Sequence, residues 1–347
     1  MKKNLSSIII SLFLFVASTS VFAVSKKIVY NDYSVKVFYP EYVQPGDAVF
    51  IRLECDLGSA RVVQDLESQG KKNETASLEL FKKLDDGNLP EKPLAKAKFY
   101  KLERHVTKES INSVLFVGVP LSTYEKAGEC VAKITYSVFD KGESTVTVPV
   151  KIFAKDFVSE TLDLDSTNTA IKTDSSDERK KQIDRLNKIL GAKHLSAVYE
   201  THRFAVPNPA KRITSNFGDR RVYKYTNGKS SESLHYGIDY GVPTGNKVRA
   251  CGRGKVVMAE NRISTGWSVC IEHLPGLYSL YYHMDKLNVE VGKIVNQGDL
   301  IGVSGATGLA TGPHLHWEVR LNMEAINPDF MLGDFAFSEE SALRKYN

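Results

Sequence analysis

Apolar and polar residues alternate along much of the first half of the chain. Between residues 33 and about 153, three runs place an apolar residue at every second position: 49–55, 130–138 and 146–152. Alternation with a period of two is typical of β-strands that bury one face. Turn-forming clusters such as Pro45-Gly46-Asp47 and Asp86-Gly87-Asn88 separate these runs. The pattern predicts an all-β domain over residues 24–155.

Turn positions and cysteines give this domain a likeness to an immunoglobulin-like β-sandwich. Pro45-Gly46-Asp47 precedes one predicted strand and Ala127-Gly128-Glu129 precedes another. Cys55 and Cys130 both occupy the apolar register of their strands, so a Cys55–Cys130 bridge would join two sheets through the core. The second half holds the pair Cys251 and Cys270. In an exported chain we expect one disulfide in each half; the alternative is buried free thiols that pack as small apolar residues.

A polar stretch separates the two halves of the chain. Residues 159–176 are rich in Ser, Thr, Asp and Asn, which is typical of a linker. A short helix is expected next, with a capping box formed by Ser175 and Glu178 and a C′ glycine at Gly191. Its apolar stripe consists of Ile183, Leu186, Ile189 and Leu190. We therefore expect a linker with a short helix over residues 156–201, resting on one of the two domains.

The strand-like pattern returns from about His202. Strand candidates are 255–259, 268–271, 278–283, 300–303 and 314–320, and glycines stand at 298, 302, 305, 308 and 312. A phosphate-binding loop would open a helix and carry a Lys-Ser/Thr pair, and neither follows these glycines. They are better explained as tight turns. The pattern predicts a second β-domain over residues 202–335 and a tail over 336–347.

The first residues predict export. A positive start at Lys2 and Lys3, an apolar run over residues 8–16 and small residues up to Ala23 are typical of a secretory signal peptide over residues 1–23. No other stretch approaches the about 20 apolar residues of a membrane span, so the mature chain is expected to be periplasmic or secreted. Without Lys2 and Lys3 the formal net charge falls from +5 to +3, which is too weak to indicate nucleic-acid binding.

Candidate chemistry gathers in the second half. In an extended segment, His314 and His316 point to the same face, which suits one metal ligand and one proton-transfer group. His235 and Asp239 are recognised zinc-ligand types, but four residues of straight strand span about 13 Å. We therefore predict a bend through Gly237 that brings the two together. His283, which follows the aromatic run 278–282, completes a set of five groups.

Four motifs in this region resemble those of the LytM/lysostaphin-type zinc endopeptidases, which cut peptidoglycan cross-links. The resemblance covers about residues 212–328. The segments are Ser215-Asn216-Phe217-Gly218-Asp219-Arg220, His235-Tyr236-Gly237-Ile238-Asp239 with Val242-Pro243-Thr244-Gly245, Tyr281-Tyr282-His283, and Gly312-Pro313-His314-Leu315-His316-Trp317-Glu318-Val319. The resemblance implies an antiparallel β-sheet peptidase domain with one Zn²⁺ held by His235, Asp239 and His316. It also implies that His283 and His314 are unligated and catalytic.

The function that follows is an exported zinc metalloendopeptidase acting on peptidoglycan peptides. Zinc would activate a water molecule, His314 would act as general base, and His283 would stabilise the oxyanion. One alternative is a non-catalytic activator of a cell-wall amidase, which would be expected to lack ligands. Another is an adhesin or host-protein-binding surface protein that acts through the N-terminal domain. That domain could instead bind a wall polymer or cover the active site.

The remaining histidines are expected to have structural or solvated positions. His105, His194 and His202 lie among charged or connector residues, and His273 is expected at a strand end. Glu318 alternates with His314 and His316 and therefore points to the same face. One alternative for its role is to accept a hydrogen bond from a ligand histidine.

Overall fold

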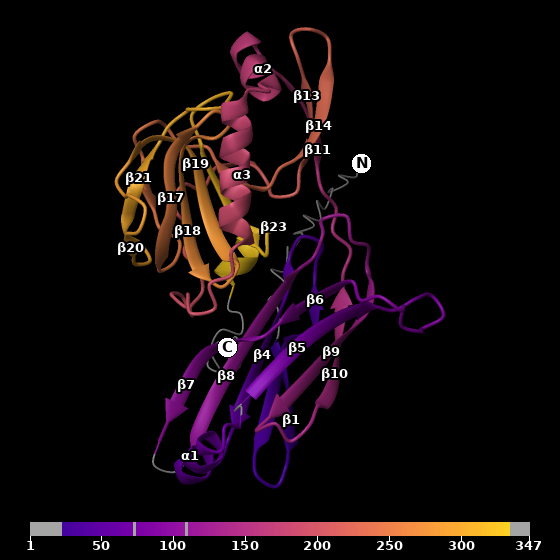
Figure 1. Ribbon diagram of the computed structural model, residues 1–347. Coiled ribbons are helices and arrows are strands. Elements are labelled where there is room, and N and C mark those ends of the chain that lie inside the picture. Colours follow the sequence, from indigo (N-terminus) through magenta and orange to yellow (C-terminus); the bar gives the residue numbers. More distant parts are fainter. Residues whose placement is uncertain (1–22, 72–73, 108–109, 334–347) are drawn as a thin grey trace, which may run out of the picture.

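The protein is described by a computed structural model that covers residues 23–71, 74–107 and 110–333. Strands dominate this part of the chain, which confirms the predicted all-β class (Figure 1). Residues 1–22 of the predicted signal peptide and the predicted tail, residues 336–347, lie outside the described residues. Within the described ranges, no helix has the length and apolar character needed to cross a membrane.

The N-terminal domain consists of two sheets that enclose one core. One sheet has the order β1 (Ala23–Val29), β2 (Ser34–Pro40), β4 (Ala48–Asp56), β8 (Ile111–Pro120) and β7 (Tyr100–Val106). The other has the order β3 (Tyr42–Val43), β10 (Ser144–Ile152), β9 (Gly128–Val138), β5 (Glu74–Lys82) and β6 (Ala95–Lys98). The alternating residues of β4, β9 and β10 fill the space between the sheets. The immunoglobulin-like topology stays a prediction. The sequence pattern did not reveal helix α1 (Ala60–Ser68).

Part of the outer face of the first sheet is also buried. On β4 the pattern predicts a polar face, yet Phe50 is 3% exposed and belongs to the core of the C-terminal domain. Its ring stacks on Phe116 at 5.4 Å and on Phe330 at 6.0 Å between ring centroids. Phe330 lies in the short 3-10 helix η1 (Pro328–Leu332). The two domains therefore share an apolar interface, and this explains why β4 carries an aromatic residue on its outward face.

The C-terminal domain is built on one antiparallel sheet. Ten strands of the described chain form it: β12 (Ile213–Ser215), β15 (Gly237–Tyr240), β16 (Lys247–Arg249), β17 (Gly254–Arg262), β18 (Gly266–Leu274), β19 (Leu277–Leu287), β20 (Ile294–Val295), β21 (Leu300–Ser304), β22 (Leu315–Leu321) and β23 (Glu324–Ile326). Helix α3 (Asp177–Gly191) crosses one face of the sheet (Figure 1). Leu190 of this helix packs with Met258, Tyr278 and Tyr282.

The connector between the domains has more structure than the polar sequence indicates. It contains β11 (Ser159–Asp163) and α2 (Ser166–Thr173). Strand β11 joins β13 (Arg220–Lys224) and β14 (Ser230–Leu234) in a three-stranded sheet and runs parallel to β13. The predicted limits of α3 are wrong by one residue at the start and by two at the end: Ser176 is the N-cap, and Gly191 is the last helical residue, followed by the C-cap Ala192.

The predicted disulfides are absent, since all four cysteines, which lie in the described part of the chain, are free and buried. Cys251 packs in the core shared with the N-terminal domain, whereas Cys270 packs under α3. These two cores lie on opposite faces of the sheet, so no bridge can form between them. Cys55 and Cys130 do share one core, where they pack as small apolar residues.

Candidate metal centre

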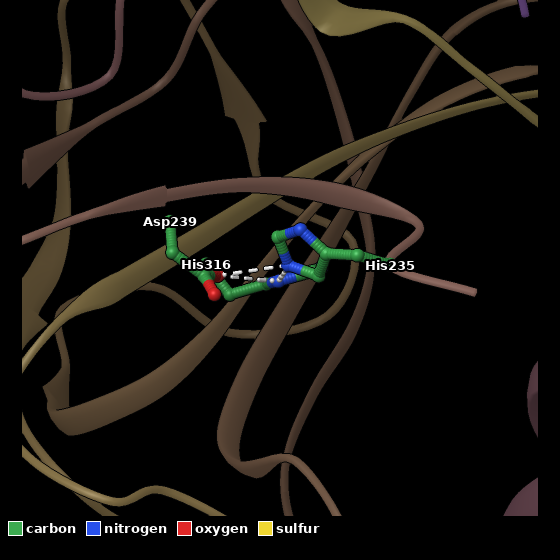
Figure 2. Close-up of side chains that lie close together, drawn as sticks. All are labelled: His235, Asp239 and His316. Carbon is green, nitrogen blue, oxygen red and sulfur yellow. Dashed lines mark hydrogen bonds and ion pairs between the residues drawn. The ribbon is translucent and has the colours of Figure 1, made fainter. Parts of the chain in front are cut away.

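Three side chains from distant parts of the sequence converge on one point. His235 Nε2 lies 3.1 Å from Asp239 Oδ1, His316 Nδ1 lies 2.8 Å from the same oxygen, and the two nitrogens are 3.1 Å apart. Figure 2 shows the three side chains directed toward one another. Tetrahedral zinc with bonds of about 2.1 Å needs ligand atoms about 3.4 Å apart. The observed triangle is slightly smaller than this, so small shifts of the side chains would admit an ion.

Two of these residues are positioned by pairing within the sheet, and the third lies in the short link between two strands. Asp239 on β15 and His316 on β22 are direct partners in the antiparallel register. His235 lies between the end of β14 and the start of β15, where the chain passes from one sheet into the other. The bend was predicted through Gly237, but Gly237 is the first residue of β15 and pairs with Glu318, so the change of direction falls at residues 235–236 instead. Gly237 itself allows close approach, because an added Cβ would lie 2.3 Å from Trp317 O and 2.7 Å from His316 Nε2.

The second polar atom of each side chain has its own partner. His235 Nδ1–H donates to Asn216 O at 2.7 Å. His316 Nε2 faces Glu318 Oε2 at 3.3 Å, as the alternation along β22 suggests. Asp239 Oδ2 accepts a hydrogen bond from Arg221 at 3.0 Å. Such outer contacts fix the tautomer and orientation of metal ligands. One atom of each residue is thus left facing the common point, as a three-ligand metal site requires.

The charges of the three groups suit a cation. Burial opposes ionisation of Asp239, but its contacts with the imidazoles of His235 and His316 hold its pKa well below the usual value. Burial lowers the pKa of His235. Burial also acts to lower the pKa of His316, yet hydrogen bonds to Asp239 and Glu318 raise it to about 9. Without metal, both ring nitrogens of His316 are therefore protonated near neutral pH, and metal binding would release one of the two protons.

His283 and His314 lie beside this triangle. Their ring centroids are 4.6 Å apart, and His314 Nε2 is 3.8 Å from Asp239 Oδ1. Each ring donates its Nδ1–H to a backbone carbonyl at 2.8 Å, His283 to Thr307 O and His314 to Gly312 O. In their neutral forms, both rings therefore offer Nε2 as a proton acceptor. Burial and the neighbouring His314 lower the pKa of His283 to about 3.

A bulge in β19 directs His283 into the site. The register passes from Val269↔Tyr281 to Trp267↔Met284, so an extra residue lies on β19. His283 has φ +59°, a left-handed conformation that non-glycine residues rarely adopt. A β-bulge re-aims a side chain, and here it takes His283 out of the regular alternation of the strand. The aromatic run before His283 gave no sign of this bulge.

An open cavity of about 880 Å³ adjoins the five residues. Its wall includes side chains that the sequence analysis did not single out: Glu160, Leu162, Leu164, Lys172, Arg212 and Arg221. Four of these come from the connector, whose polar composition gave no sign of a place beside the site. The cavity thus opens onto His235, Asp239 and His316 and is bounded on one side by connector residues.

The other histidines lie away from the five residues. His105, His194 and His202 are exposed and contact Glu103, Glu272 and Glu200, respectively. His273 is fully buried near the end of β18, where its ring bonds Ser279 Oγ at 2.7 Å and Arg253 O at 2.8 Å. These contacts give His273 a structural position, in agreement with its expected place at a strand end.

The part of the chain that contains this site is similar to known peptidases. The sequence profile of Peptidase family M23 matches residues 233–328. An uncharacterised metalloprotease of Buchnera aphidicola is 38% identical over 117 residues, which cover 34% of this chain and 30% of that protein. Peptidoglycan DD-endopeptidase ShyA of Vibrio cholerae is 39% identical over 116 residues, which cover 33% of this chain and 26% of ShyA.

Among solved structures, the catalytic domain of the antimicrobial peptidase lysostaphin from Staphylococcus simulans is 30% identical. The match covers 35% of this chain and 91% of that chain, with a TM-score of 0.30. The present chain spans less than a third of the length of the two curated relatives it matches. The family match, residues 233–328, lies in the C-terminal domain.

Proposed function

Because residues 233–328 form a peptidase family M23 domain, we propose that this protein is a zinc-dependent endopeptidase that hydrolyses peptide cross-links of peptidoglycan. The observation that carries the proposal is the triangle of His235, Asp239 and His316, whose facing atoms lie within 3.1 Å of one another. ShyA, a DD-endopeptidase by name, supports peptidoglycan as the substrate class. All five predicted groups are present, and so we favour an enzyme over a non-catalytic activator.

His235, Asp239 and His316 would hold the zinc ion. Two imidazoles and one carboxylate are a donor set that zinc accepts in catalytic sites. When bound, zinc supplies a Lewis acid and lowers the pKa of water toward 7. The chain's own residues then have to orient the water molecule, accept its proton and pass that proton to the leaving amine.

His314 is the general base in this proposal. Its Nδ1–H is held by Gly312 O, so its Nε2 lone pair is available to accept a proton. His283 is held in the same way by Thr307 O. In its neutral form, His283 would accept a hydrogen bond at Nε2 from the same water molecule and so orient it. The oxyanion role predicted for His283 requires a proton on Nε2, and burial of the ring opposes that protonation.

Export fits the substrate. Peptidoglycan lies outside the cytoplasm, and we propose that the N-terminal segment directs secretion, with cleavage near Ala23. The N-terminal domain packs on the peptidase domain through Phe50 and its neighbours. We propose that it positions the peptidase relative to a wall polymer or a partner protein.

The proposal is tested with purified chain from residue 24 onward and isolated peptidoglycan. We expect soluble fragments to be released, release to stop after metal removal by a chelator, and release to return with zinc. The variant Asp239→Ala is the control and should release nothing while it keeps the far-UV spectrum of the original chain. A zinc-loaded chain that releases no peptide fragments would refute the proposal.

A further inference from the structure

The connector between the domains reaches the metal site through one strand. β11 runs parallel to β13, and Glu160 stands directly opposite Arg221 in the register. Figure 1 shows β11 beside β13 and β14, which form a small sheet separate from the sheets of the two domains. Both Glu160 and Arg221 line the cavity. Neither belongs to the segment that matches the family profile, which begins at residue 233.

Arg221 joins Glu160 to the proposed ligand Asp239. Its Nε–H donates to Glu160 Oε1 at 2.7 Å, and its Nη2–H donates to Asp239 Oδ2 at 3.0 Å. The side chain of Arg221 is 13% exposed, that of Asp239 is 8% exposed and that of Glu160 is 30% exposed. A guanidinium has a planar fork of donors that serves two carboxylates at once. Glu160, Arg221 and Asp239 thus form a hydrogen-bond network that runs from the connector to the site.

This hydrogen-bond network determines which oxygen of Asp239 faces His235 and His316. Oδ2 is occupied by Arg221, and Oδ1 is the atom that faces His235 and His316. A freely rotating carboxylate would have to be ordered when the metal binds, at an entropic cost. A cation so close to a dication also repels it, and Glu160 compensates the charge of Arg221. We propose that Arg221 and Glu160 are positioning residues for Asp239, so that connector strand β11 is a working part of the metal site.

The inference rests on the proposed role of Asp239 as a ligand, and metal affinity tests it without an activity assay. In the full chain, Arg221→Lys keeps the positive charge but cannot donate to Glu160 and Asp239 with the same fork. Glu160→Gln keeps the size of the side chain and removes the compensating charge. Competition for zinc against a chromogenic chelator should show affinity reduced about 10–100-fold in each variant, the usual effect of losing a partner of a ligand.

Two further measurements separate positioning from a general loss of structure. The melting temperature without metal should change little in either variant, whereas the rise in melting temperature on adding zinc should shrink. The double variant should lose less affinity than the two single losses combined, because both residues act through one contact. Arg212→Lys is the matched control, since Arg212 lines the same cavity and, among the described residues, its side chain has no hydrogen bond to a ligand.

The outcomes distinguish the two ideas. If the original chain binds no zinc, the proposed function fails. If the original chain binds zinc and Arg221→Lys binds it within twofold of the original affinity, the positioning role is overturned. A fall in metal-free melting temperature with unchanged zinc affinity would also overturn it, because that result describes a residue needed only for folding.

Discussion

Asp239 and His316 face each other across the antiparallel pair of β15 and β22, and Asp239 Oδ1 lies 2.8 Å from His316 Nδ1. A strand register is specified to the residue, because a slip of one position turns every side chain to the opposite face. Burial of Ile238 and Trp317, which also pair in this register, holds it in place. The hydrophobic core thus determines the geometry of the two proposed ligands.

Replacement of Gly237 by alanine should damage the site without touching a ligand. The new Cβ would lie 2.3 Å from Trp317 O, a backbone atom that can move only if β15 and β22 separate. We expect a loss of roughly 1–3 kcal/mol in unfolding free energy, typical of overpacking, together with weaker zinc binding. Urea unfolding and zinc competition measure the two effects. Gly292→Ala is a control because an added Cβ meets nothing within 4 Å, although its φ of +96° adds some backbone strain. Equal zinc affinity in Gly237→Ala and the original chain would contradict this account.

His283 and His314 should be separable from the ligands by a metal assay. His314→Ala should retain one zinc and lose about 10²–10⁴-fold in kcat, the usual contribution of a general base. His283→Ala should also retain zinc, because its ring contacts Thr307 and His314 and lies outside the ligand triangle. Metal content and kcat on a cross-linked peptide measure both effects. If either variant is purified without metal, that histidine belongs to the ligand set and its assignment here is wrong.

The sequence predicts the site better than its surroundings. His314 and His316 line the same cavity, as their alternation predicts, and His235 does approach Asp239, although the chain changes direction before Gly237 and not through it. The sequence did not point to Arg221 and Glu160, because their pairing depends on β11 lying parallel to β13, which is 61 residues further along the chain. The segment 159–163 is short and mostly polar, so neither its length nor its hydrophobic periodicity indicates a strand. The bulge that turns His283 inward likewise depends on its partner strand, not on its neighbours in sequence.

Stability should depend on pH through Asp47 at the domain interface. Burial raises the pKa of Asp47 from 3.8 to about 6, so the folded chain keeps a proton that the unfolded chain loses between about pH 4 and pH 6. The free energy of unfolding therefore falls as the pH rises through this window and stays lower above it, by about 3 kcal/mol for this group. Asp47→Asn should be more stable than the original chain at pH 7 and equally stable near pH 4.

Urea unfolding across this pH range measures the difference for Asp47→Asn. The exposed Glu91→Gln serves as a control for the loss of one surface carboxylate. A stability difference between Asp47→Asn and the original chain that is the same at pH 4 and pH 7 would contradict the raised pKa.

Reducing agents should leave the folded chain unchanged. All four cysteines are free, and burial raises the pKa of Cys55 to about 12 and of Cys130 to about 11. We expect a thiol reagent to react slowly with the native chain and to count four thiols after denaturation without reductant. The melting temperature should be the same with and without dithiothreitol. Fewer than four thiols in the denatured chain would indicate a disulfide and contradict the packing described above.

The most direct test of the central claim is mass spectrometry of the products formed from purified cross-linked muropeptide dimers. The zinc-loaded chain should convert dimers to monomers by adding one water molecule across a peptide bond of the cross-link, and Asp239→Ala should leave the dimers intact. Dimers that stay intact with the zinc-loaded chain, or that are cleaved equally by Asp239→Ala, would contradict the claim that these three side chains form a metallopeptidase site.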